Sequence, residues 1–141
     1  MVREIKFKAW DKKTKTIRNV MSIDFAKEEV MIEPIPSDGM YEFFKTGDIF
    51  TGGYVRKMVD VILMQSTGLY DKNGKEIYEG DILSPKDRDV LFVVIWDNDI
   101  ASFKFKGRYG VYEIDESILS LEIVGNIHDN PELLEETKWK H

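Results

Sequence analysis

The sequence predicts a β-dominated fold, and three observations carry this prediction. Short β-prone segments recur along the chain, turn residues separate them, and a single segment near the C-terminus has helix signals. The 141 residues suffice for a hydrophobic core, and a hydrophobic share of 43% is too high for a disordered chain. We therefore expect a single domain over residues 1–141, built as a small barrel-like antiparallel meander.

The first predicted element is a hairpin. Residues 5–10 alternate apolar and basic side chains with the period of a half-buried strand. Residues 11–15 supply a polar turn, and residues 16–23 supply the return strand. Residues 30–33 have the composition of a further strand, after which two prolines interrupt backbone hydrogen bonding.

The segment from Ser22 to Lys57 is the least regular part of the sequence, and we expect an irregular N-terminal insertion there. From Met40 to Lys57, aromatic residues such as Phe43 and Phe50 alternate irregularly with glycines. A short helix, a strand and an irregular loop all fit this pattern.

Residues 67–83 contain the highest density of turn-forming residues, and we expect a hairpin there, followed by a change in chain direction. Asn73–Gly74 is the dipeptide typical of a type I′ hairpin turn, in which both central residues need a positive φ. Residues 59–65 lead into this hairpin as a buried apolar strand. Gly80–Asp81 then predict a break in the chain, after which a new strand begins at Ile82.

The sequence of the second half of the chain predicts a meander of antiparallel strands. Residues 90–96 are apolar on both faces, so we place them at the centre of the sheet or barrel. Residues 101–106 and 111–114 follow as shorter strands, and residues 119–127 form the last one.

A short helix is predicted from Pro131 to about residue 138. Asn130 is placed to cap it, and a proline at the first helical position lacks an N–H that the helix does not need. Trp10 and Trp96 are expected to belong to the core rather than to a contact surface.

Composition excludes several classes of function. The absence of cysteine excludes disulfides, cysteine-ligated zinc or iron–sulfur sites and a thiol nucleophile. A net charge of −6 repels polyanions unless basic residues cluster locally. The N-terminal residues contain no apolar run of signal or membrane-spanning length. We expect a cytoplasmic protein in its host cell, with no cofactor and no membrane partner.

Three segments, residues 3–11, 64–82 and 123–134, together resemble the YopX family of phage and prophage proteins. Members of that family usually carry an aromatic residue where this chain has Ser66. The resemblance implies a β-rich fold encoded by mobile genetic elements, and self-association. It assigns no biochemical activity and gives no residue a catalytic role. The motif positions in this chain are Trp10, Asp11, Gly68, Asn73, Gly74, Gly80, Asp81, Gly125, Asn126, Asn130 and Pro131.

Two acid pairs are candidates for metal or proton chemistry. Glu79 with Asp81, and Asp97 with Asp99, have the spacing of divalent-cation ligands or of carboxyls that share a proton. Such pairs are also common in turns, where aspartate accepts hydrogen bonds from its own backbone, and we favour that role and predict no metal site. The two histidines are too few for a histidine-rich site, and we expect a surface or capping role for His128.

Residues 103–109 interleave aromatic rings with cations, an arrangement found in binders of single-stranded nucleic acid. An amphipathic strand with its phenylalanines facing inward and its lysines in water has the same sequence pattern, and we favour that structural interpretation. The candidate nucleic-acid contacts are Lys104, Lys106, Arg108 and Tyr109.

Three hypotheses follow, in this order. The first is a non-enzymatic phage accessory protein that binds an unknown protein partner or forms a homo-oligomer, through an uncovered sheet edge or an apolar patch in residues 40–54. The second is a nucleic-acid-binding module that uses the basic strand. The third is a metal-dependent enzyme, for which the sequence supplies no recognisable base, nucleophile or phosphate loop.

Overall fold

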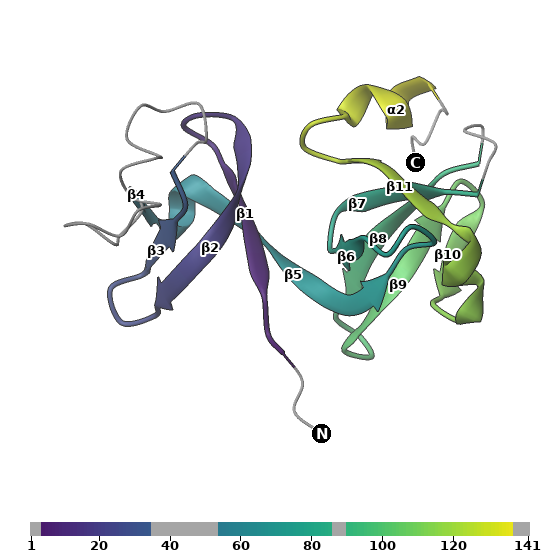
Figure 1. Ribbon diagram of the computed structural model, residues 1–141, viewed down its shortest axis with the longest axis horizontal. Coiled ribbons are helices and arrows are strands. Elements are labelled where there is room, and N and C mark those ends of the chain that lie inside the picture. Colours follow the sequence, from purple (N-terminus) through teal and green to yellow (C-terminus); the bar gives the residue numbers. More distant parts are fainter. Residues whose placement is uncertain (1–3, 35–53, 86–89, 137–141) are drawn as a thin grey trace. The chain divides into compact units, whose positions relative to one another are not determined.

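The computed structural model of the protein describes residues 4–34, 54–85 and 90–136. Its residue contacts group into two compact units, which we call the N-terminal unit (residues 6–64) and the C-terminal unit (residues 1–5 and 65–141). Both units are built mainly of strands (Figure 1). The prediction of a β-dominated fold is confirmed, and each unit is described by itself below.

The N-terminal unit is a sheet with the strand order β4-β3-β2-β1-β5. Its elements are β1 (Phe7–Asp11), β2 (Thr16–Asp24), β3 (Glu29–Ile32), β4 (Tyr54–Lys57), the 3₁₀ turn η1 (Met58–Asp60) and the first part of β5 (Val61–Tyr70). Strands β1 to β4 pair antiparallel, and the pairing of Trp10 with Ile17 confirms the first predicted hairpin.

The core of the N-terminal unit is formed by the apolar side chains that alternation directs to one face. Ala9, Val30, Ile32 and Val61 are buried together. The strand predicted at residues 30–33 is therefore confirmed as β3, and part of the segment left open is the strand β4. Residues 35–53, with Phe43 and Phe50, lie outside the described residues.

A buried cluster of charged side chains lies at the turn of the first hairpin. The Asp11 carboxylate has no exposed surface and accepts hydrogen bonds from Arg56 Nε at 3.0 Å and Arg56 Nη2 at 3.2 Å. Arg18 Nη1, also buried, lies 3.4 Å from Asp11 Oδ2, and the Thr14 hydroxyl donates to the same oxygen at 2.7 Å. The two guanidinium groups lie 5.5 and 5.7 Å from the centre of the Tyr54 ring. Asp11 thus joins the β1–β2 turn to β4.

The C-terminal unit contains an open five-stranded sheet of order β10-β9-β8-β7-β11. Its elements are the second part of β5, β6 (Glu76–Tyr78), β7 (Asp81–Ser84), β8 (Phe92–Asp97), β9 (Ser102–Gly107), β10 (Gly110–Glu113), the 3₁₀ helix η2 (Glu116–Ser120), β11 (Glu122–Asn126) and the helix α2 (Pro131–Glu136). Strands β10 and β11 are the two ends of this sheet, so the meander is not closed into the expected barrel.

Strand β8 is the middle strand of that sheet, as its apolar sequence predicted. Val94 packs on one side with Leu83 and Phe105, while Val93 packs on the other with Ile82. Adjacent residues of a strand point to opposite faces, so a strand with both faces covered must be apolar at every position. The second face is covered in part by Leu133 and Leu134 of α2.

The central hairpin forms where expected, but its turn is not of type I′. Gly74 has a φ of 80°, whereas Asn73 is absent from the described residues with positive φ. The Asp71 carboxylate explains the difference, because its Oδ1 accepts the N–H groups of Asn73 and Lys75, both at 2.9 Å. Its Oδ2 accepts the N–H of Ile123 at 3.0 Å. Asp71 therefore organises the turn and ties it to β11.

Two further features of the C-terminal unit concern motif positions. Ser66, buried at the start of the β5–β6 pairing, donates to Glu76 and accepts the N–H of Gly68. A Cβ on Gly125 would lie 2.5 Å from Asn130 Oδ1, the atom that accepts the N–H of Asn126. Glycine is thus the residue that permits this loop to fold back ahead of α2, which is described as far as residue 136.

Both buried aspartates make the stability of their units depend on pH. Burial raises the pKa of Asp11 and of Asp71, but hydrogen bonds from Arg56 and Thr14, and from the N–H groups of Ile123 and Lys75, outweigh it and hold both below 3.8. The unfolded chain therefore binds more protons as the pH falls through 3.8, so the stabilisation present above that pH is lost below it.

We expect the urea midpoint of each unit to be lower at about pH 3 than at about pH 6. Variants that keep only Trp10 or only Trp96 report the two units separately by tryptophan fluorescence. Asp11→Asn should flatten the pH dependence of the N-terminal unit alone, and Asp71→Asn that of the C-terminal unit alone. Equal midpoints at the two pH values would contradict the assignment.

Candidate functional site

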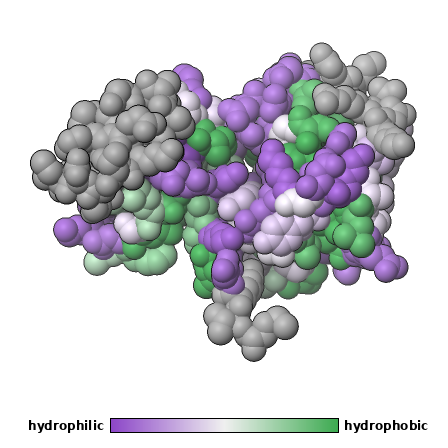
Figure 2. Space-filling model, viewed as in Figure 1, coloured by the Kyte–Doolittle hydropathy of each residue, from purple (hydrophilic) through white to green (hydrophobic). Residues whose placement is uncertain are grey.

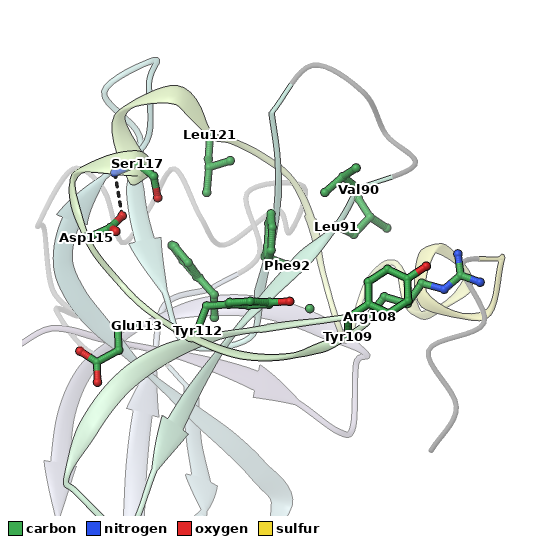
Figure 3. Close-up of a pocket in the computed structure, with 12 residues that line it drawn as sticks. Val90, Leu91, Phe92, Arg108, Tyr109, Tyr112, Glu113, Asp115, Ser117 and Leu121 are labelled. Carbon is green, nitrogen blue, oxygen red and sulfur yellow. Dashed lines mark hydrogen bonds between the residues drawn. The ribbon is translucent and has the colours of Figure 1, made fainter.

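The C-terminal unit contains a cavity of about 580 Å³ beside the strand β10 (Figure 3). This volume is in the range of sites that hold small ligands or inserted side chains. Residues from β8, β9, β10 and η2, and from the segments next to them, form its lining. They are Val90, Leu91, Phe92, Phe105, Gly107, Arg108, Tyr109, Tyr112, Glu113, Asp115, Ser117 and Leu121.

Aromatic rings form the centre of the lining. The Phe92 ring packs edge-on against Tyr112, with 6.0 Å between ring centres, and at a tilt against Phe105, with 5.8 Å between centres. The pairing of β9 with β10 places Phe105 opposite Tyr112. A Cβ on Gly107 would lie 3.0 Å from Tyr112 Cε2 and 3.2 Å from Phe92 Cε1. The absence of a side chain at residue 107 therefore lets both rings approach the sheet.

Charged groups lie at opposite ends of the cavity. Arg108 is in the turn before β10, with its guanidinium 5.5 Å from the centre of the Tyr109 ring. Figure 3 shows this pair on one side and Asp115 with Ser117 on the other. Hydrogen bonds from Ser117 hold the pKa of Asp115 below 3.8, so this carboxylate is ionised at neutral pH. Together with Glu113 it makes the far end of β10 acidic.

Strand β10 is the exposed edge of the sheet. All four of its residues are exposed, Val111 by 51% and Tyr112 by 45%, and the adjoining Tyr109 by 85%. Among the described strands it pairs with β9 alone. Apolar surface is visible on both units in Figure 2. At β10, exposed apolar side chains adjoin a strand edge whose backbone N–H and C=O groups are available for pairing. We call β10 together with this cavity the β10 site.

The structure separates the four residues predicted to contact nucleic acid. Arg108 and Tyr109 line the cavity, whereas Lys104 and Lys106 do not. Lys104 Nζ forms an ion pair with Asp97 Oδ2 at 3.1 Å, and Lys104 lies opposite Glu113 in the β9–β10 pairing. The inward placement of the phenylalanines is confirmed for Phe105, which is 3% exposed.

One carboxylate of each acid pair has a structural partner. Asp81 Oδ2 accepts the N–H of Tyr78 at 2.8 Å, and Asp97 Oδ1 accepts the N–H of Asp99 at 2.9 Å. Within residues 4–34, 54–85 and 90–136, no three histidine, aspartate or glutamate side chains gather as metal ligands would. The N–H of His128 donates to Asn126 Oδ1, and partial burial lowers the pKa of its imidazole. His141 lies outside the described residues.

Trp96 departs from its predicted role in the core. Its side chain packs edge-on against Phe103, with 4.9 Å between ring centres, but remains 38% exposed. The residue stands near the end of β8, where the sheet offers fewer neighbours to cover a large ring. Trp10 is partly buried in β1.

Comparison with known proteins relates the whole fold to a family. The sequence model of the YopX protein family matches residues 6–135. The chain belongs to the YopX family. No protein of the curated collection matches this YopX protein. It is similar to a solved structure, the crystal structure of protein EF1440 from Enterococcus faecalis, with 28% sequence identity and a TM-score of 0.63. The match covers 94% of this chain and 99% of the other.

Two features of this YopX protein were missed from the sequence: the 3₁₀ helix η2 and the cavity below it. The signal for η2 is Asp115, a side chain that caps a helix by accepting the N–H of Ser117 at 2.9 Å. The cavity has no local signal, because its lining comes from segments up to 31 residues apart, from Val90 to Leu121. Among its described residues this YopX protein has no helix long and apolar enough to cross a membrane.

Proposed function

We propose that this YopX protein is a phage or prophage accessory protein that binds another protein and catalyses no reaction, and that the β10 site is its contact surface. The supporting observation is the combination of an exposed edge strand with an aromatic cavity that opens beside it. An edge strand supplies main-chain hydrogen bonds for an added strand, and a neighbouring pocket selects a side chain of that strand.

The composition of the β10 site supports binding, because charged groups stand at its two ends and exposed aromatic rings lie between them. Asp115 caps η2 and Arg108 stacks on Tyr109. The aromatic residues Tyr109 and Tyr112 are exposed, and aromatic rings with arginine are the side chains that dominate protein interfaces. The carboxylates at one end of the site, and the ion pair that engages Lys104, give less support to nucleic-acid binding.

A cavity-filling variant tests this proposal. Gly107→Ala adds a methyl group 3.0 Å from Tyr112 and 3.2 Å from Phe92, so the two rings that line the cavity must shift by a few tenths of an ångström. We expect tagged wild-type protein to retain a specific partner from cells that carry its gene, and the variant to retain about ten-fold less. Quantitative mass spectrometry of the captured material measures the difference.

The control is Leu119→Ala, which removes an apolar side chain that is 69% exposed on η2 and lies outside the lining. It should capture as much partner as the wild type. Tyr112→Ser, which removes one wall without adding atoms, should behave like Gly107→Ala if both keep the wild-type melting temperature. Equal capture by all variants would contradict the proposed site. Loss of the captured material after nuclease treatment would favour the nucleic-acid hypothesis instead.

A further inference from the structure

We infer that the β10 site selects one class of partner: an extended protein segment that pairs antiparallel with β10 and carries a basic residue N-terminal to a large apolar residue. This inference rests on the proposed function and adds the chemistry and direction of the bound segment. It is carried by the orientation of Tyr112 in β10 and by the unequal charges at the two ends of that strand.

The first step concerns the apolar residue. Every described pairing within the five-stranded sheet is antiparallel, so a further antiparallel strand at β10 continues the same pattern. Directly opposed residues of an antiparallel pair project from the same face of the sheet. The residue opposite Tyr112 therefore projects on the cavity side. A large apolar side chain at that position covers the rings of Tyr112 and Phe92.

The second step concerns direction. Strand β10 begins after the Arg108–Tyr109 turn and ends at Glu113, which Asp115 follows closely. An antiparallel segment runs the opposite way, so the residues before its apolar side chain lie beside Glu113 and Asp115. A basic side chain there meets the Glu113 carboxylate, with Asp115 beyond it at the same end of β10. An acidic side chain on the other flank meets Arg108, and reversing the order of the charges sets like charges against each other.

The third step excludes a polyanion as occupant of the same edge. A phosphate backbone along β10 reaches Arg108 at one end but meets Glu113 and Asp115 at the other. Lys104, the nearest cation across the hairpin from Glu113, is held by Asp97 at 3.1 Å. The net charge of −6 adds a repulsive field. A basic and apolar protein segment satisfies these charges, whereas a nucleic acid does not.

Fluorescence anisotropy with synthetic peptides tests the inference. The first peptide carries a lysine before a central tryptophan and a glutamate after it, and the second has the same residues in reverse order. We expect the wild type to bind the first about five- to ten-fold more tightly, since exposed charge pairs are individually weak and two of them change together. Replacing the tryptophan by serine should abolish measurable binding, because the cavity is then left empty.

A charge-reversed protein supplies the decisive comparison. The double variant Arg108→Glu with Glu113→Lys exchanges the charges of two exposed side chains, so its fold should persist. It should prefer the second peptide over the first, although Asp115 weakens the preference. Equal binding of both peptides by the wild type, an unchanged preference in the double variant, or no binding of any peptide would each overturn this inference. Competition by a single-stranded oligonucleotide would also overturn it.

None of these results decides the proposed function, which depends on the Gly107→Ala capture. The Gly107→Ala variant could fail to capture the partner while the wild type binds the two peptides equally. The β10 site would then bind protein without distinguishing the order of charges in the bound segment.

Discussion

Replacing Asp11 by asparagine is expected to lower the free energy of unfolding of the N-terminal unit by about 3–5 kcal/mol, because one partner of a buried charge cluster is then removed. The Asp11 side chain is completely buried, and Arg18 beside it is 5% exposed. Asparagine keeps the shape of the carboxyl group but not its charge. The guanidinium groups of Arg18 and Arg56 would then face each other without the anion between them.

Urea unfolding of a variant with Trp10 as its sole tryptophan measures this effect. The matched control is Asp60→Asn in the same unit. Asp60 is paired only weakly with Lys13, at 3.9 Å, and its side chain is 36% exposed beside a Lys13 side chain that is 61% exposed. Loss of an exposed ion pair should cost at most about 0.5 kcal/mol. If the two variants had equal free energies of unfolding, the buried charge cluster around Asp11 would not stabilise the N-terminal unit as proposed.

Replacing Asp71 by alanine is the second large effect, an expected loss of about 3 kcal/mol in the C-terminal unit. The carboxylate accepts three main-chain N–H groups, those of Asn73, Lys75 and Ile123. The N–H of Ile123 belongs to a partly buried strand and cannot be fully rehydrated after the substitution. The substitution removes all three side-chain contacts at once, and the main-chain bonds of the turn, such as the one from the Lys72 N–H to Leu121 O, remain.

A variant with Trp96 as its sole tryptophan reports this unit. Asn73→Ala is the control, because it removes a side chain in the same turn and keeps the N–H that Asp71 accepts. We expect Asn73→Ala to lie within about 0.5 kcal/mol of the parent. A comparable loss in both variants would assign the stability of the turn to side-chain contacts of Asn73 rather than to the Asp71 carboxylate.

Local patterns predicted the strands whose apolar residues show directly which face, or faces, of the strand are covered. The alternation before Asp11 predicts β1, and the two-faced apolar run predicts the central position of β8. In both cases each side chain's environment follows from its parity in the strand, which the sequence displays directly. The family motifs added the extent of the fold, which the match over residues 6–135 confirms.

Features that depend on distant partners were not predictable in this way. The Asn73–Gly74 dipeptide indicates a hairpin, but the turn type is decided by the Asp71 carboxylate, which is also bonded to a residue 52 positions later. Barrel closure was expected because it removes exposed edges, but it requires β10 to pair with β11, and the described strands do not form that pairing. The β10 site joins the β8–β9–β10 hairpins to η2 and Leu121, so its lining comes from segments up to 31 residues apart.

The contacts of Asp71 have a consequence for how the sequence can diverge. Because its carboxylate binds main-chain N–H groups, the hydrogen bonds do not depend on the side chains at Asn73 and Lys75, provided that neither is proline. Substitutions can therefore accumulate around Asp71 while Asp71 itself is constrained.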